Sequence, residues 1–121
     1  MMKLKNKVSN YEVIDDFIPD YTNDHIFKVL SGRSFPWYIS EKVVDDGDEY
    51  WNSQYYHMLY SNHTHYKSNY YSLIDTIIKK LDPAVILRAK VNSTAYQQNV
   101  IEFPFHVDTN FKSKTCVYYV N

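Results

Sequence analysis

The sequence predicts a single α+β domain, because stretches with the periodicity of helices and stretches with the alternation of strands occur within one chain of 121 residues. Residues 69–81 carry apolar side chains at helical spacing, and Asp82-Pro83 ends that pattern because a residue before proline avoids the helical conformation. Residues 84–94 instead alternate between apolar and polar side chains, as a strand with one packed face does. The apolar stripe of the helix therefore needs a sheet to pack on.

The first half of the chain predicts another helix and three short strands. The helix covers residues 22–31, where the apolar side chains lie mostly on one side. Stretches rich in aromatic and β-branched residues predict strands at residues 11–14, 35–40 and 55–60. One face of the last of these strands carries Tyr55, His57 and Leu59.

The composition indicates a folded protein without a bias in charge. Thirteen basic and fourteen acidic residues leave a net charge of -1, so the charge does not favour nucleic acid or an anionic membrane as the main partner. The lone Cys116 excludes an internal disulfide and indicates a reducing compartment, and we expect it to be buried in a strand as a small apolar residue. No apolar stretch approaches the length of a membrane span, so the sequence predicts a cytoplasmic protein.

The last third of the chain carries the most informative polar residues. Residues 101–108 predict a strand in which His106 and Asp108 share one face. An imidazole and a carboxylate are two of the three ligands of the non-haem Fe(II) site that is built from two histidines and one carboxylate. A His-x-Asp triplet alone is a weak signal, but here a polar break and a second predicted strand, residues 115–120, follow it.

This combination of motifs resembles the 2-oxoglutarate and Fe(II)-dependent dioxygenases of the prolyl-hydroxylase class, especially the small versions carried by phages. The closest likeness lies in His106-Val-Asp108 and in the later segment from Lys114 to Asn121. Further matching segments, which extend the likeness over nearly the whole chain, are Val13 to Asp20, Phe35-Pro-Trp-Tyr38, Leu81-Asp-Pro83 and Leu87 to Asn92.

The resemblance implies a fold, a reaction and its cofactors. The fold would be a partial double-stranded β-helix (a jelly roll), with two N-terminal helices packed outside it and core strands near residues 84–94, 101–108 and 115–120. His106 and Asp108 would bind Fe(II), and 2-oxoglutarate would be the co-substrate, with ascorbate as an accessory reductant. The enzyme would convert 2-oxoglutarate and dioxygen to succinate and CO₂ while it hydroxylates a peptidyl or small-molecule substrate.

Two tyrosines match positions next to the co-substrate in that family. Tyr119, the second member of the Tyr118-Tyr119 pair, corresponds to the residue that hydrogen-bonds the far carboxylate of 2-oxoglutarate. Tyr96 precedes the metal strand, as a tyrosine of the co-substrate pocket does in related enzymes. Each is also explained as an ordinary half-buried or core tyrosine. Arg88 is not assigned as the 2-oxoglutarate anchor, because the basic residue of the family comes from a later strand.

The second histidine of the family, and its basic anchor for 2-oxoglutarate, belong to strands that follow the matched segment, and no residue here can be assigned to either role. We therefore expect a C-terminally truncated domain of residues 1–121, with its final strands missing and little or no activity. The half-built sheet would leave an unpaired strand edge at which two copies pair. If a phage encodes the chain, its compartment is the cytoplasm of the host.

Other functions are open at this point. In a metal-free β-rich binding or virion-associated domain, His106 and Asp108 would lie on the solvated face of an antiparallel strand. A cupin-like Zn or Mn hydrolase would need further ligands near the pair, and only Glu102 is close. The polar flanks of His63-Thr-His65 favour a solvated loop over an adventitious metal site.

Overall fold

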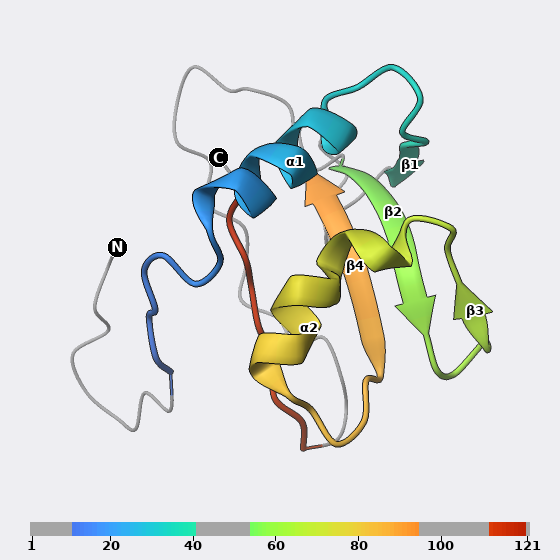
Figure 1. Cartoon of the computed structure of the whole chain (residues 1–121). Coiled ribbons are helices and arrows are strands. Elements are labelled where there is room, and N and C mark those ends of the chain that lie inside the picture. Colours follow the sequence, from blue (N-terminus) through green and yellow to red (C-terminus); the bar gives the residue numbers. More distant parts are fainter. Residues whose placement is uncertain (1–10, 41–53, 95–111, 121) are drawn as a thin grey trace.

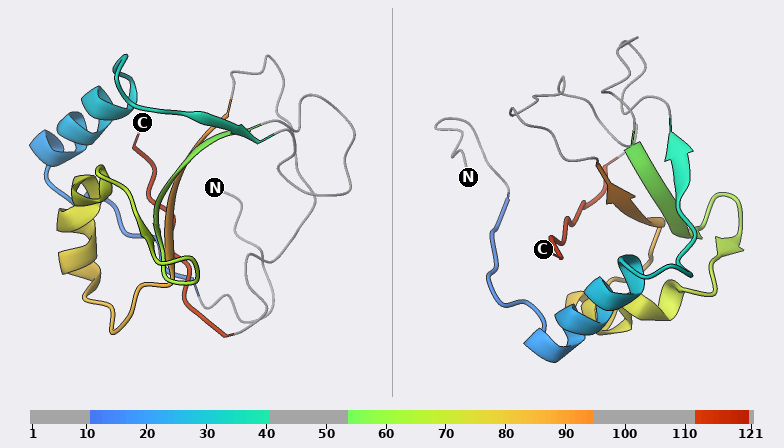
Figure 2. Two further views of the ribbon diagram at one scale, coloured as in Figure 1. Left: turned by 90° about the vertical axis from the view of Figure 1, so that its right-hand side faces the viewer. Right: turned by 90° about the horizontal axis from the view of Figure 1, so that it is seen from above.

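The computed structural model describes residues 11–40, 54–94 and 112–120, which form helices and a four-stranded antiparallel sheet (Figure 1). The elements in chain order are α1 (Asp20–Leu30), β1 (Tyr38–Ser40), β2 (Gln54–Ser61), β3 (Tyr66–Lys67), the 3-10 helix η2 (Tyr71–Ile74), α2 (Asp75–Leu81) and β4 (Arg88–Ser93). Both α-helices lie on the same face of the sheet (Figure 2). The predicted α+β class is therefore confirmed.

Strand β2 is the centre of the sheet. β4 pairs with it along one edge, from Tyr55 opposite Ser93 to Ser61 opposite Arg88. β1 and β3 pair with its two ends and so share the other edge. The register with β4 shifts between Met58 and Tyr60, which inserts one extra residue into β2 at that point.

Helix α1 begins two residues before its predicted start, because an extended proline closes its first turn. The carbonyl of Pro19 accepts the backbone N–H groups of Thr22 and Asn23 at 3.0 and 3.1 Å. At the other end, the hydroxyl of Ser31 donates to the carbonyl of Phe27 at 2.7 Å and satisfies one of the terminal acceptors.

The second predicted helix divides into η2 and α2. Ser68 accepts two hydrogen bonds from the start of this helical segment. Its side-chain Oγ accepts the N–H of Tyr70 at 3.1 Å, and its backbone carbonyl accepts the N–H of Tyr71 at 3.1 Å. The helix ends at Asp82, whose backbone is left-handed with φ of 47°. The prediction that the residue before Pro83 leaves the helical conformation is therefore confirmed.

Strand β4 is shorter than the predicted strand at residues 84–94. Its first residue, Arg88, pairs with Ser61, the last residue of β2, and one further bond joins the N–H of Asn62 to the carbonyl of Leu87 at 2.9 Å. The length of the partner strand thus sets where β4 begins. Local alternation alone carries no information about that length.

Two predicted strands, residues 11–14 and 115–120, are wrong, because neither belongs to the sheet. The C-terminal described segment runs alongside β4, on the side away from β2 (Figures 1 and 2). It is held there through a side chain, since the hydroxyl of Tyr118 donates to Oδ1 of Asn23 on α1 at 2.6 Å. Cys116, predicted to be buried, is exposed. The described strands form an open sheet, and the predicted strand at residues 101–108 lies outside the described residues.

The core lies between the helices and the sheet. Its buried apolar side chains in the described residues are Ile18, Ile26, Phe35 and Leu59. Two polar side chains, His57 and Ser68, are buried among them. In the described part of the chain, no helix has the length and the apolar character needed to cross a membrane.

Candidate functional site

Three of the four residues predicted to form the iron and co-substrate site, His106, Asp108 and Tyr96, lie outside the described residues. The fourth, Tyr119, lies on the C-terminal segment with 80% of its surface exposed. Its neighbour Tyr118 is the partly buried tyrosine of the pair and makes the hydrogen bond to α1. Burial, and to a smaller extent the carboxylate of Asp20, raise the pKa of Tyr118 above its usual value.

The buried polar cluster of the described residues is centred on His57, which is 3% exposed. Its Nδ1 lies 2.8 Å from the carbonyl oxygen of Pro36, and its Nε2 lies 2.6 Å from the Oγ of Ser68. Because a carbonyl only accepts, Nδ1 carries a proton and donates it to Pro36. In the neutral ring, Nε2 then accepts the hydroxyl hydrogen of Ser68, while the Oγ of Ser68 accepts the N–H of Tyr70. Every group in this chain of hydrogen bonds is thereby satisfied.

Aromatic rings enclose this imidazole. The ring centroids of Phe35 and Tyr70 lie 4.7 and 5.7 Å from that of His57. The rings exclude water from the cluster and strengthen its hydrogen bonds by lowering the local dielectric constant.

A serine and a histidine at this distance, with the histidine oriented by a third group, are also the geometry of an activated nucleophile. Here, however, Ser68 is only 7% exposed and its oxygen already accepts a backbone N–H. A substrate carbonyl therefore has no approach to that oxygen. We conclude that His57 and Ser68 connect β2, the Pro36 segment and the start of the second helical segment, and that the pair is structural.

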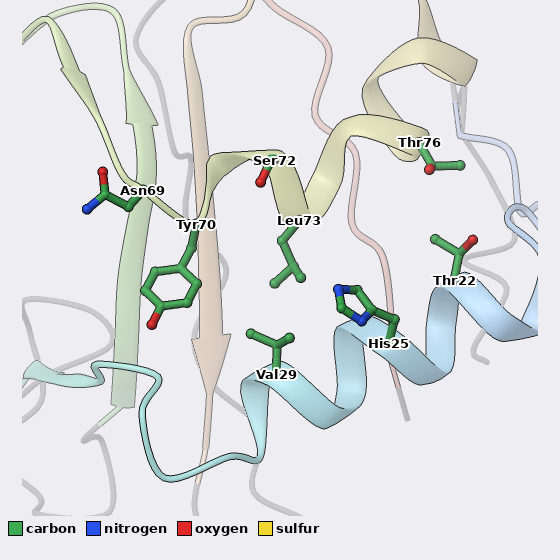
Figure 3. A pocket seen from close by; sticks show the side chains of 8 residues that line it. All are labelled: Thr22, His25, Val29, Asn69, Tyr70, Ser72, Leu73 and Thr76. Carbon is green, nitrogen blue, oxygen red and sulfur yellow. The ribbon is translucent and has the colours of Figure 1, made fainter.

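A shallow groove of about 270 Å³ separates α1 from the second helical segment (Figure 3). Figure 3 shows the side chain of His25 between the two helices, close to Leu73 and Val29, with Thr22 and Thr76 at one end. The lining contains no carboxylate, lysine or arginine. The groove therefore has no fixed charge with which to orient an ionic ligand.

The face of the sheet turned away from the helices is polar and aromatic. His57 pairs with Val91 and points toward the helices, so the alternating neighbours of this pair point the other way. In register these are Tyr56 opposite Asn92 and Met58 opposite Lys90, and β4 adds Arg88. We call the surface formed by Tyr56, Met58, Arg88, Lys90 and Asn92 the helix-free face.

Metal-binding groups in the described part of the chain do not form a cluster: no three His, Cys, Asp or Glu side chains there could hold one ion. His63 and His65 lie in the exposed turn between β2 and β3, and the backbone of His65 is left-handed with φ of 54°. The prediction of a solvated loop at this position is confirmed.

The comparisons with known proteins found no matching family model, no matching curated protein and no matching solved structure.

Proposed function

We propose that this chain belongs to an Fe(II)- and 2-oxoglutarate-dependent dioxygenase and carries two of its iron ligands, His106 and Asp108. The observation that carries the proposal is the sequence His106-Val-Asp108 followed, after a polar loop, by the segment from Lys114 to Asn121. The pairing of an imidazole with a carboxylate two residues away suits Fe(II) chemically, because these are the ligand types of the site with two histidines and one carboxylate.

The described fold supports the proposal at a coarser level. In a jelly-roll dioxygenase with helices outside the sheet, the opposite face of the sheet is the one that can line a site. Here both helices pack on one face, and β4, which precedes the predicted metal strand in the chain, exposes Arg88 and Asn92 on the other. An antiparallel sheet with one packed and one polar face is also common among other proteins. The proposal therefore depends on the His106-Val-Asp108 motif, and the fold is only consistent with it.

The proposed roles follow the donor chemistry of each residue. His106 and Asp108 hold the metal, which supplies activation of dioxygen together with bound 2-oxoglutarate. Tyr119 and Tyr96 donate hydrogen bonds to 2-oxoglutarate, with ascorbate as an accessory reductant. The second histidine of the family has no assigned counterpart in the 121 residues, so the two-ligand site binds metal weakly and turnover is slow or absent.

Metal binding tests the proposal without requiring turnover. Mn²⁺, a paramagnetic substitute for Fe(II), is titrated into the protein, and electron paramagnetic resonance measures the free ion. We expect weak binding at a single site that His106→Ala and Asp108→Asn each weaken at least about tenfold. The matched control is His63→Ala, which removes an exposed imidazole from the turn after β2 and leaves the affinity unchanged. Equal affinities of the wild type and His106→Ala would remove this histidine from the site.

The second candidate function is a metal-free β-rich binding domain. The observation that favours it is the strict alternation of exposed and half-buried residues along β4, which an ordinary solvated sheet face also explains. This function predicts that neither Mn²⁺ nor 2-oxoglutarate changes the unfolding temperature of the protein.

A further inference from the structure

The helix-free face concentrates positive charge on a chain whose net charge is -1. Arg88 and Lys90 supply two cations on this face, and the other residues that define it, Tyr56, Met58 and Asn92, are uncharged. Arg88, Lys90 and Asn92 are all exposed. The acidic residues of the described helices are Asp20, Asp24 and Asp75, and the other described acidic residues, Glu12, Asp15, Asp16 and Asp82, lie in connecting segments. The charge of this face therefore complements an anionic partner.

The spacing of the two cations indicates which kind of anionic partner this face fits. Residues two apart on a strand lie about 7 Å from each other on one face. An extended peptide repeats its own side chains at the same interval, so carboxylates at alternate positions of a peptide match Arg88 and Lys90. Lys90 also has another interaction of its own within the protein, so we assign the principal contact to Arg88. Its planar guanidinium binds a carboxylate through two parallel hydrogen bonds.

Aromatic surface lies beside these charges. Tyr38 pairs in register with Tyr56, and their ring centroids are 6.0 Å apart. Tyr38 is 54% exposed, so its ring is accessible to an apolar side chain of the same peptide. Asn92 lies opposite Tyr56 on β4 and offers an amide that both donates and accepts hydrogen bonds.

We propose that the helix-free face binds an extended acidic peptide, with a carboxylate on Arg88 and an apolar residue on the tyrosine pair. This inference rests on the proposed dioxygenase function, for which it names the substrate class: an extended acidic peptide. A nucleic acid is the less favoured anionic partner, because two cations on a chain of net charge -1 do not match a polyanionic backbone.

The test uses a fluorescein-labelled peptide of eight residues that carries Glu at three alternate positions and Leu at the fourth, and fluorescence anisotropy measures its binding to the whole chain. We expect binding that weakens as salt rises from about 0.05 to 0.5 M, because the contacts are partly exposed charge pairs. Arg88→Gln weakens binding about fivefold. Arg33→Gln makes the same change at an exposed residue of the loop after α1 and leaves binding unchanged. Circular dichroism establishes that both variants are folded.

Three outcomes would overturn the inference: equal affinities for Arg88→Gln and Arg33→Gln, equal binding of a peptide in which Gln replaces Glu, or tighter binding of an oligonucleotide with the same number of charges. The variant His106→Ala separates this inference from the proposed function. If the acidic peptide binds in an Arg88-dependent way while no Mn²⁺ site is found, the peptide-binding surface is supported and the dioxygenase function is contradicted. If the Mn²⁺ site is present while Arg88→Gln has no effect, the inference alone falls.

Discussion

The Nε2 atom of His57 on β2 lies 2.6 Å from the Oγ of Ser68, the residue that starts the second helical segment. Together with the bond from Nδ1 to the carbonyl of Pro36, this contact fixes three segments of the chain to one buried imidazole. The polar cluster therefore orients the sheet relative to the second helical segment. The contribution of this cluster to the unfolding free energy of the protein can be measured directly.

Replacing His57 by phenylalanine keeps the aromatic packing but removes both ring nitrogens. The carbonyl of Pro36 and the hydroxyl of Ser68 then remain in the core without their partner, which costs about 2 to 4 kcal/mol of unfolding free energy. Urea denaturation measures the loss. The control, His25→Phe, changes an exposed imidazole of α1 and alters the unfolding free energy by less than about 0.5 kcal/mol. Equal effects of the two substitutions would show that the cluster does not stabilise the fold.

Ser68→Ala removes the hydrogen bond to His57 and the acceptor for the N–H of Tyr70. We expect a loss of about 1 to 2 kcal/mol, because a helix-starting serine and a buried hydrogen bond are lost together. Ser72→Ala, at an exposed position of η2, is the matched control and leaves the unfolding free energy nearly unchanged. If Ser72→Ala lowered the unfolding free energy as much as Ser68→Ala, the two hydrogen bonds of Ser68 would not contribute measurably to stability.

Leu59, at the irregular point of β2, is 1% exposed, so Leu59→Ala leaves a cavity in the core. We expect a loss of about 2 to 5 kcal/mol in thermal or urea unfolding. The same substitution at Leu81, which is partly exposed at the end of α2, removes less buried surface and costs less than about 1 kcal/mol. If Leu59→Ala lowered the unfolding free energy no more than Leu81→Ala does, the core would not depend on Leu59.

The attachment of the C-terminal segment should depend on pH through Tyr118. Because burial, followed by Asp20, raises its pKa in the folded state, the protonated phenol stabilises the fold. That stabilisation is fully present below the unfolded pKa of about 10 and is lost as pH rises through the higher folded pKa. Tyr118→Phe removes the hydroxyl that donates to Asn23 and lowers the unfolding free energy by about 1 kcal/mol at neutral pH.

Unfolding experiments at about pH 8 and pH 11 should therefore show a larger difference between the wild type and Tyr118→Phe at the lower pH than at the higher pH. The adjacent Tyr119→Phe changes a tyrosine that is largely exposed and serves as the control, with no difference at either pH. A difference for Tyr118→Phe that did not fall at all as the pH was raised into the alkaline range would show that the protonated hydroxyl is not what holds the segment.

The helices could be predicted from the sequence, because their signals are local. The apolar spacing of residues 69–81 and the break at Pro83 depend only on neighbours within a few residues. The shared burial of His57 and Leu59 on β2 follows from strand alternation in the same way. The bond between His57 and Ser68 could not be predicted, since it joins residues eleven positions apart through a turn and a strand whose path the local pattern does not define.

The strand ends were less predictable for a related reason. β4 begins at Arg88 because its partner β2 ends at Ser61, and only the assembled sheet shows this limit. Residues 115–120 have the composition of a buried strand, but composition does not supply a partner, and in the structure Tyr118 attaches this segment to α1 instead. Of the predicted site, only Tyr119 lies in the described residues; its role, like those of His106, Asp108 and Tyr96, stays a prediction.

The most direct test of the proposed function is the visible absorption that arises when 2-oxoglutarate chelates protein-bound Fe(II), recorded without oxygen. If His106 and Asp108 hold the iron, a charge-transfer band requires both Fe(II) and 2-oxoglutarate, is present in the wild type and in His63→Ala, and is lost in His106→Ala and Asp108→Asn. A band of equal strength in His106→Ala, or no band in the wild type at saturating metal and co-substrate, would contradict the assignment of these two residues as iron ligands.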